Sequence, residues 1–301
     1  MKFKQKINYV ANNLPYRSIS PINDTEVISF LKKIEKKIKL IKILNDGSIQ
    51  KKFLNRFKKW IQVSKLNKIK NLNRFKYSCI SQGTSQAFDY FYLKNHKRNF
   101  KIIKGDYAYH PISLRSGGIK WSFLNEKKIS KNDAIIISVP FSGNGSIAPN
   151  FDSILTDCEK QNVPVMIDFC YLPVSAGINI DLKYKCIKEV TFSLSKCFPV
   201  GHLRIGMRLS LSDDDDPMFV YHKFNYTNRL SSFIGLELIK KFSMDFIYNK
   251  YKKKQIFYCK KLNLLPTNVV TLALGDKKWS KYKRANWNRL CLSKLYVKNQ
   301  K

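Results

Sequence analysis

Residues 191–206 read TFSLSKCFPVGHLRIG and place one lysine, Lys196, directly after an apolar run that ends in hydroxyl side chains. Arg204 follows eight residues later, before a second apolar run. A lysine in a dry pocket has a pKa below its free value of about 10.4, and its neutral amine can attack an aldehyde. Ser193, Ser195 and Arg204 suit a phosphate, because arginine offers a planar fork of donors. The stretch therefore indicates amine chemistry beside a phosphate site.

The chain around this stretch alternates between short apolar runs and helix-length segments. Runs that read as strands buried on both faces lie at 101–103, 134–139, 163–168, 190–193 and 205–209. A helix is expected between two of them, at 152–161. Continuous apolar strands separated by helices are typical of a parallel sheet covered on both faces. The sequence therefore predicts an α/β fold.

Two upstream segments carry polar residues where such a sheet would end its strands. Asp168 ends the run 163–168 and could serve a site or cap the next helix. The turn 81–87 opens a helical segment with Gly83, Thr84 and Ser85. Free N–H groups at a helix start favour an anion. Both segments fit a site built at one edge of the sheet.

The opening stretch resembles the lysine signature of the fold-type I pyridoxal-phosphate (PLP) enzymes, specifically the class I/II aminotransferase family. That signature is a small, an apolar and a small residue, then lysine, followed after a short loop by arginine, an apolar residue and glycine. The resemblance places Lys196 on the Schiff-base lysine and Ser193 and Arg204 on phosphate ligands. Pro199 and His202 depart from the family, which usually has small residues there.

Other segments match the family in the same order along the chain. Asp168 falls on the aspartate that pairs with the pyridine nitrogen, so that the ring accepts carbanion electrons. Tyr171 falls on the tyrosine that reaches the cofactor's phenolic oxygen, and Gly83, Thr84 and Ser85 fall on the phosphate-binding turn. The resemblance thus implies PLP as cofactor, with Lys196, Asp168 and Tyr171 as catalytic residues.

Two family positions have a first and a second candidate here. For the aromatic ring that stacks on the pyridine, Tyr107 is the first choice and Tyr109 the second. For the arginine that binds the substrate α-carboxylate, Arg289 is the first choice and Arg284 the second. A planar, bidentate donor suits a carboxylate, although either arginine could also be one more cation of a basic protein.

The family's Asn-Pro-x-Asn-Pro-x-Gly segment corresponds to residues 139–145. Only Pro140 and Gly145 match it cleanly. Ser142 occupies the position of the asparagine that hydrogen-bonds the phenolic oxygen, and Asn144 lies two residues further on. Which side chain acts from this side of the cofactor therefore stays open.

The chain is expected to divide into three parts. These are a basic helical N-terminal segment (1–75), a large cofactor-binding domain (76–225) and a small C-terminal domain (226–301) that is reduced relative to the family. In the first part, helices are expected over 25–44, capped by the residues 23–25, and over 51–65. A long helical stretch is expected over 217–262. The family's N-terminal substrate loop has no counterpart that can be assigned.

Composition excludes several classes of protein. Of 301 residues, 44% are hydrophobic, which rules out wholesale disorder. The net charge of +35, from 56 basic and 21 acidic residues, suits a phosphate-bearing partner such as nucleic acid, but is better read as a surface property of a Lys-, Asn- and Ile-rich chain.

No apolar stretch approaches the roughly 20 residues of a membrane span, and no secretory signal is visible, so no membrane partner is expected. The seven cysteines form no C-x-x-C pair, so we expect free thiols in a reducing cytoplasm and no metal site.

The sequence therefore predicts a three-layer α/β sandwich with a mostly parallel sheet and a reduced α+β domain. The resemblance implies a homodimeric, PLP-dependent aminotransferase that moves an amino group between an amino acid and a 2-oxo acid. Two alternatives stay open: another PLP reaction on the same fold, such as decarboxylation or elimination, and a basic nucleic-acid-binding protein. The amino donor and acceptor cannot be read from the sequence.

Overall fold

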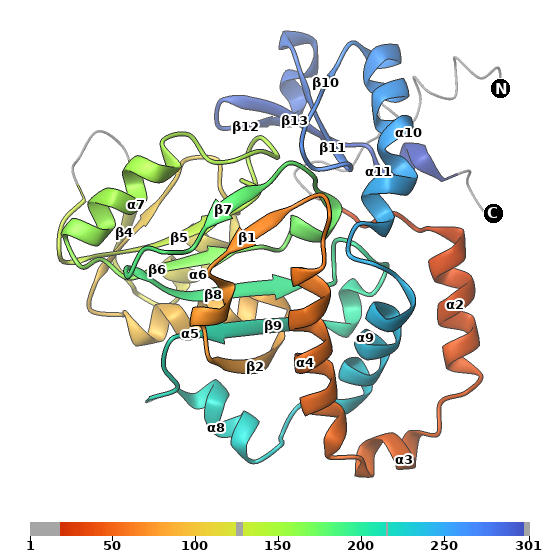
Figure 1. Ribbon diagram of the computed structural model, residues 1–301. Coiled ribbons are helices and arrows are strands. Elements are labelled where there is room, and N and C mark those ends of the chain that lie inside the picture. The colour runs from red at the N-terminus through yellow and green to blue at the C-terminus, as the bar shows by residue number, and fades with distance from the viewer. Residues whose placement is uncertain (1–18, 125–128, 215, 298–301) are drawn as a thin grey trace.

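The computed structural model describes residues 19–124, 129–214 and 216–297, and a seven-stranded sheet forms its centre (Figure 1). The strand order is β2-β9-β8-β6-β5-β3-β4. Only β9 runs against its two neighbours, β2 and β8, and the other pairs are parallel. The strands are β2 Tyr77–Gln82, β3 Asn99–Ile102, β4 Trp121–Phe123, β5 Asp133–Ser138, β6 Val165–Asp168, β8 Ile187–Ser193 and β9 Ile205–Ser210.

Helices cover both faces of this sheet, as the alternation along β5 shows. Ile135 and Ile137 pack into one apolar cluster with side chains of α4 Ser48–Gln62, α7 Phe151–Lys160 and α9 Arg229–Lys241. Ala134 and Ile136 point to the other face, into a second cluster with α5 Gly83–Lys94 and α6 Tyr109–Ser116. Every residue of β5 is buried, as expected for a strand covered on both sides. The predicted three-layer sandwich is confirmed.

A smaller antiparallel sheet, in the order β10-β11-β13-β12, lies at one end of the molecule with α10 against it (Figure 1). Its elements are α10 Phe246–Leu262, β10 Leu265–Pro266, β11 Leu272–Gly275, β12 Lys283–Arg284, β13 Trp287–Cys291 and α11 Ser293–Tyr296. A separate parallel pair joins β1 Lys68–Lys70 to β7 Asn179–Asp181. Short 3₁₀ helices span Leu72–Arg74, Leu172–Val174, Gly201–Leu203 and Lys277–Tyr282.

Two of the expected helices are broken, which corrects the sequence prediction. The segment 25–44 forms α2 Thr25–Glu35 and α3 Leu40–Asn45, and 217–262 forms α8 Pro217–Lys223, α9 and α10. Asn228 caps α9 by accepting a hydrogen bond from the Ser231 amide at 2.9 Å, so the backbone turns there. The cap of α2 is confirmed, since Asp24 accepts from the amides of Glu26 and Val27.

The helix α4, from the N-terminal part of the chain, packs extensively against α9, and both lie on the large sheet. The segments 1–75 and 226–301 therefore each contribute a helix to the central layers, and the division at 75 and 225 stays a prediction. Among the described residues, no helix is long and apolar enough to cross a membrane. The same residues contain no cluster of three His, Cys, Asp or Glu side chains that could hold a metal ion.

Candidate active site

A pocket opens where β5, β6 and β8 end, at the edge where ligands bind in open α/β sheets. Eight of its lining residues are predicted site residues: Thr84, Ser85, Tyr107, Asp168, Tyr171, Ser195, Lys196 and Arg204. The other two, Ser138 and Cys170, were not predicted.

The amine of Lys196 lies inside this pocket, three residues beyond the end of β8. Its Nζ donates a hydrogen bond to the main-chain oxygen of Ile19 at 2.8 Å. Burial acts to lower the pKa of Lys196, but the facing side chains of Tyr171 and Cys170 act to raise it, and the net pKa lies above the ordinary value. The direction is opposite to the lowered lysine pKa expected from the sequence, so that expectation is wrong.

The carboxyl group of Asp168 ends β6 and is 3% exposed. It accepts a hydrogen bond from the Cys170 amide at 2.9 Å. Burial, with a smaller contribution from the nearby carboxylate of Asp106, raises the pKa of Asp168 to about 8, while the Cys170 amide and Lys196 act in the opposite direction. Because its ionised form is disfavoured by burial, this carboxyl suits a cationic partner, such as a protonated ring nitrogen.

Asp106 is a second buried acid at this edge, just beyond β3. It accepts hydrogen bonds from both the amide and the hydroxyl of Ser138 and from the amide of Tyr107. Ser138 is the last residue of β5 and lies directly across from Asp168 in the sheet register. Asp106, Ser138 and Asp168 therefore bring three neighbouring strand ends together under the pocket.

The opposite side of the pocket is built to receive an anion. The helix α5 starts there at Gly83, which has a φ of +67°, and the side chain of its N-cap residue, Gln82, makes no capping hydrogen bond. The Arg204 guanidinium donates to Ser85 Oγ at 2.8 Å, and a Cβ at Gly83 would lie 2.4 Å from Arg204 Nη2. The glycine is thus required for the arginine to lie against the helix start, where both the dipole and the guanidinium favour negative charge.

Ser193 and Gly83 support this side without lining the pocket. Ser193 is fully buried at the end of β8, and its hydroxyl donates to Ser195 Oγ at 2.9 Å and accepts from the Ser195 amide at 3.1 Å. It therefore holds Ser195 in place. Gly83 donates its amide to the main-chain oxygen of Arg204 at 3.0 Å, which fixes the two halves of the anion site to each other.

The two tyrosine candidates are separated by position. Tyr107 lines the pocket, whereas the Tyr109 hydroxyl donates to the carboxylate of Asp89 at 2.8 and 2.9 Å and does not reach it. The two rings stack on each other with centroids 5.8 Å apart. Beneath Tyr107 lies His110, a fully buried side chain whose Nε2 has no partner among the described residues.

The predicted residues on the C-terminal side lie just outside the pocket. Arg289 is buried and donates to the main-chain oxygen of Ser142 and, at 3.3 Å, to Ser142 Oγ. Burial lowers the pKa of Arg289 to about 10.

The remaining two candidates make local contacts. Asn144 closes a turn by accepting a hydrogen bond from the Ser146 amide at 2.9 Å. Arg284 donates to the main-chain oxygens of Gly105 at 3.0 Å and of Asp106 at 2.5 Å, which ties β12 to the loop that carries Tyr107.

Four residues of the site were not predicted from the sequence: Ile19, Asp106, Ser138 and Cys170. The last three follow or end predicted strands, so the rule that polar residues at strand ends meet at one sheet edge could have found them. Ile19 carries no such signal, because it contributes a main-chain oxygen from a segment more than 170 residues away in sequence.

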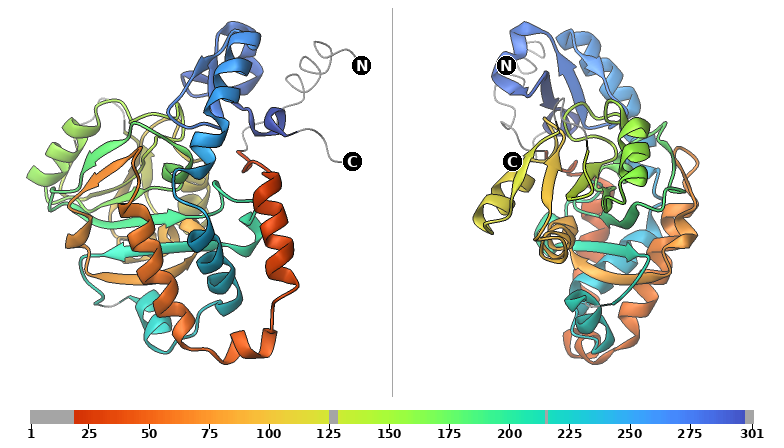
Figure 2. Two further views of the ribbon diagram at one scale, coloured as in Figure 1. Left: turned by 45° about the vertical axis from the view of Figure 1, so that its right-hand side comes forward. Right: turned by 90° about the vertical axis from the view of Figure 1, so that its left-hand side faces the viewer.

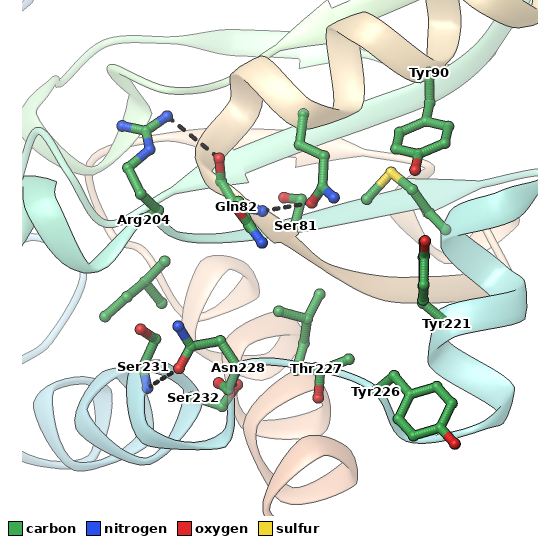
Figure 3. Close-up of a pocket in the computed structure, with 14 residues that line it drawn as sticks. Ser81, Gln82, Tyr90, Arg204, Tyr221, Tyr226, Thr227, Asn228, Ser231 and Ser232 are labelled. Carbon is green, nitrogen blue, oxygen red and sulfur yellow. Dashed lines mark hydrogen bonds between the residues drawn. The ribbon is translucent and has the colours of Figure 1, made fainter.

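A second, larger pocket adjoins the first through Arg204, which lines both (Figure 3). It lies between the start of α5 on one side and Asn228 and Ser231 on the other. Tyr90, Tyr221 and Tyr226 gather at one end of it (Figure 3). Tyr221 is 50% exposed and Tyr226 75% exposed. Arg204, the arginine of the anion site, is therefore accessible from both pockets.

Comparison with known proteins gives the fold from solved structures. No family model matches the chain, and no curated protein matches its sequence. Histidinol-phosphate aminotransferase from Clostridium acetobutylicum is 17% identical over 87% of this chain and 82% of its own, with a TM-score of 0.60. Aminotransferase AspB from Helicobacter pylori is 14% identical over 96% and 92%, with a TM-score of 0.63. The PLP-bound C-S lyase from Staphylococcus hominis, with L-cycloserine, is 12% identical over 89% and 77%, with a TM-score of 0.65.

At these identities the likeness concerns the fold, and it extends over most of both chains in each case. The chain has the fold of the fold-type I PLP-dependent enzymes, as the motif around Lys196 predicted. Because the similar structures include both aminotransferases and a lyase, the fold leaves the reaction open.

Proposed function

We propose that this protein is a PLP-dependent aminotransferase that exchanges an amino group between an amino acid and a 2-oxo acid. The observation that carries the proposal is the convergence of three chemically different groups on one pocket. A lysine amine, a buried aspartate with a raised pKa and an anion site made of a helix start and an arginine all face the same space. A ligand with an aldehyde, a protonatable ring nitrogen and a phosphate would satisfy each of them.

The residues present fit PLP. Thr84, Ser85, Ser195 and Arg204 would hold its phosphate, Asp168 would pair with its ring nitrogen, and Lys196 would carry it. Tyr107 would cover one face of the ring, and Tyr171 would donate to its phenolic oxygen. Ser142 points to Arg289 instead, so the hydrogen bond expected from Ser142 is not part of this proposal. When bound, PLP supplies an electron sink for the carbanion left by loss of a proton from the substrate Cα.

The protein's own groups would then position the substrate and move that proton. The Lys196 amine would act as the base that takes the proton from the substrate Cα and delivers it to the carbon that was the cofactor's aldehyde carbon, as transamination requires. Arg289 binds the substrate α-carboxylate, for which it exchanges its hydrogen bonds to Ser142. Asp168 would keep a proton on the ring nitrogen.

A second PLP reaction is favoured by one observation, the presence of a C-S lyase among the similar structures. An elimination or a decarboxylation would use the same Lys196 and Asp168. A nucleic-acid-binding role remains the third candidate, supported only by the net charge of +35.

The proposed enzyme is a cytoplasmic homodimer. In support, Arg204 borders the open adjoining pocket, and exposed aromatic and aliphatic side chains lie around α8, including Val220, Phe224 and Tyr226. A second subunit on this face would exclude water from the anion site. All seven cysteines are buried free thiols, which suits a reducing compartment.

The test is the absorbance spectrum of the protein with PLP, measured beside Lys196→Ala. We expect a protein-bound band for the natural protein and the spectrum of the free aldehyde for the variant. Identical spectra would contradict the role of Lys196. Half-reactions then separate the reactions, because an aminotransferase leaves the aminated cofactor and a 2-oxo acid, whereas carbon dioxide or an elimination product points to the alternatives.

A further inference from the structure

The short helix α3 exposes aliphatic side chains at one tip of the molecule. Leu40, Ile41 and Leu44 are 47%, 70% and 45% exposed. Figures 1 and 2 place α3 at the end of the molecule opposite the small sheet, at the turn between α2 and α4. A cluster of exposed aliphatic side chains on a protruding element marks an interaction surface more often than isolated exposed residues do.

The helix is held so that this side stays outward. Ile43, on the inner side, is buried in contact with the body of the protein. The Arg229 guanidinium at the start of α9 donates to the main-chain oxygen of Leu44. Packing of α3 therefore fixes the side of Ile43 and leaves Leu40, Ile41 and Leu44 exposed.

Lysines lie beside these aliphatic side chains, and three of them, Lys37, Lys39 and Lys42, line a hollow between α3 and α9 together with Ile43. Residues 32–52 contain eight lysines, two acidic residues, no arginine and no aromatic residue. Lys36, Lys37, Lys39 and Lys42 are exposed and make no ion pair with any residue that the structure describes. Of the two acids, Asp46 already lies 3.8 Å from Lys52. Exposed aliphatic side chains and exposed lysines without ion pairs therefore lie next to each other at this tip.

This combination favours an anionic lipid surface over two other partners. A nucleic acid would use the lysines but has no use for exposed leucine and isoleucine. A second copy of the chain, related by a twofold axis, would set lysines against lysines. Aliphatic side chains that enter the boundary of a bilayer while lysines meet its phosphates satisfy both features.

We propose that the surface formed by Leu40, Ile41, Leu44, Lys37, Lys39 and Lys42, here called the α3 tip, docks peripherally on bilayers that contain anionic lipids. The expectation of no membrane partner came from the lack of a spanning segment, and surface docking requires none. The proposal concerns a surface apart from the pocket, so it stands or fails independently of the proposed enzyme activity.

Co-sedimentation of the full-length protein with vesicles tests the proposal. The vesicles are phosphatidylcholine alone, or phosphatidylcholine with about one third phosphatidylglycerol, compared at physiological salt. Three variants are used: Leu40→Ser/Ile41→Ser/Leu44→Ser, Lys37→Gln/Lys39→Gln/Lys42→Gln, and a control, Lys97→Gln/Lys253→Gln/Lys260→Gln, that removes the same charge from other exposed positions. Circular dichroism and gel filtration verify that each variant is folded.

We expect binding to the anionic vesicles only, and a loss of about tenfold or more for the aliphatic variant. Each lysine near an anionic surface contributes roughly fivefold, so the α3 lysine variant loses about 100-fold, and the control loses far less. Equal losses for the control and the α3 lysine variant, or unchanged binding of the aliphatic variant, would overturn the proposal. So would a wild-type dimer that the aliphatic variant breaks, or binding to single-stranded RNA in place of vesicles that only the lysine variant weakens.

Discussion

The amine of Lys196 donates a hydrogen bond to the main-chain oxygen of Ile19 at 2.8 Å. Ile19 lies just before α2, whose N-cap, Asp24, is buried and held by Tyr251 and Lys250 at 2.7 Å each. The residue proposed to carry the cofactor is thus tied to an N-terminal segment in which no family motif can be placed. The same nitrogen cannot serve this hydrogen bond as an ammonium and be bonded to PLP.

We therefore expect PLP binding to loosen the segment around Ile19. A hydrogen bond from a charged donor contributes about 1.5–3 kcal/mol, so exchange of the amides in residues 20–27 should accelerate about tenfold or more. Hydrogen exchange read by mass spectrometry, with and without PLP, measures this. Lys196→Met is the control, since it lacks the donor and should exchange fast in both conditions. Slower or unchanged exchange in the natural protein would show that the segment does not respond to the lysine.

Gly83→Ala is expected to weaken PLP binding by about tenfold or more. The new Cβ would lie 2.4 Å from Arg204 Nη2, so the guanidinium must leave the start of α5. The positive φ also costs about 1–2 kcal/mol of folding free energy for any residue with a Cβ. Spectroscopic titration with PLP and urea denaturation measure the two effects separately.

Gly118→Ala is the matched control for that prediction. Gly118 has a φ of +65°, close to that of Gly83, but no described atom lies within 4 Å of its added Cβ. It should lose similar stability and keep its affinity for PLP. An equal loss of PLP affinity in both variants would mean that backbone strain, and not the position of Arg204, weakens the site.

The sequence predicted the parts of this site that lie close to one another along the chain. Lys196, Ser193 and Ser195 belong to one strand end, and apolar runs that can only be buried strands predict where that end lies. Arg289 and Ser142 could be assigned to a strand and a turn, but their contact with each other could not be predicted, because it joins segments 147 residues apart. The bond between Lys196 and Ile19 is of the same kind: a main-chain oxygen has no side-chain signature, and only the tertiary fold brings it to the pocket.

Asp168 should make the stability of the protein without cofactor fall as the pH rises. Its pKa, about 8 in the folded protein against an ordinary 3.8, means that the folded state binds the proton more tightly than the unfolded state. Between about pH 4 and pH 8 the free energy of unfolding therefore decreases, by up to about 1.4 kcal/mol per pH unit from this one group. Urea denaturation across this range compares the natural protein with Asp168→Asn, which should lack the slope, and with Asp152→Asn on the exposed side of α7, which should keep it. Parallel curves for all three proteins would show that Asp168 is ionised in the folded state.

Arg289→Lys should raise the KM for the amino donor by about tenfold or more and change kcat much less. A lysine keeps the charge but loses the planar pair of donors that matches a carboxylate, and this loss is felt mainly in binding. Arg284→Lys is the matched variant, because Arg284 is the second candidate and donates to main-chain oxygens beside Tyr107. It ties β12 to the loop that carries Tyr107, so its replacement should leave the KM nearly unchanged and instead alter the absorbance of bound PLP through the position of Tyr107. Steady-state kinetics with several amino donors measure the split. If Arg284→Lys raises the KM and Arg289→Lys does not, the carboxylate-binding arginine is Arg284, and Arg289 serves only to hold the turn at Ser142.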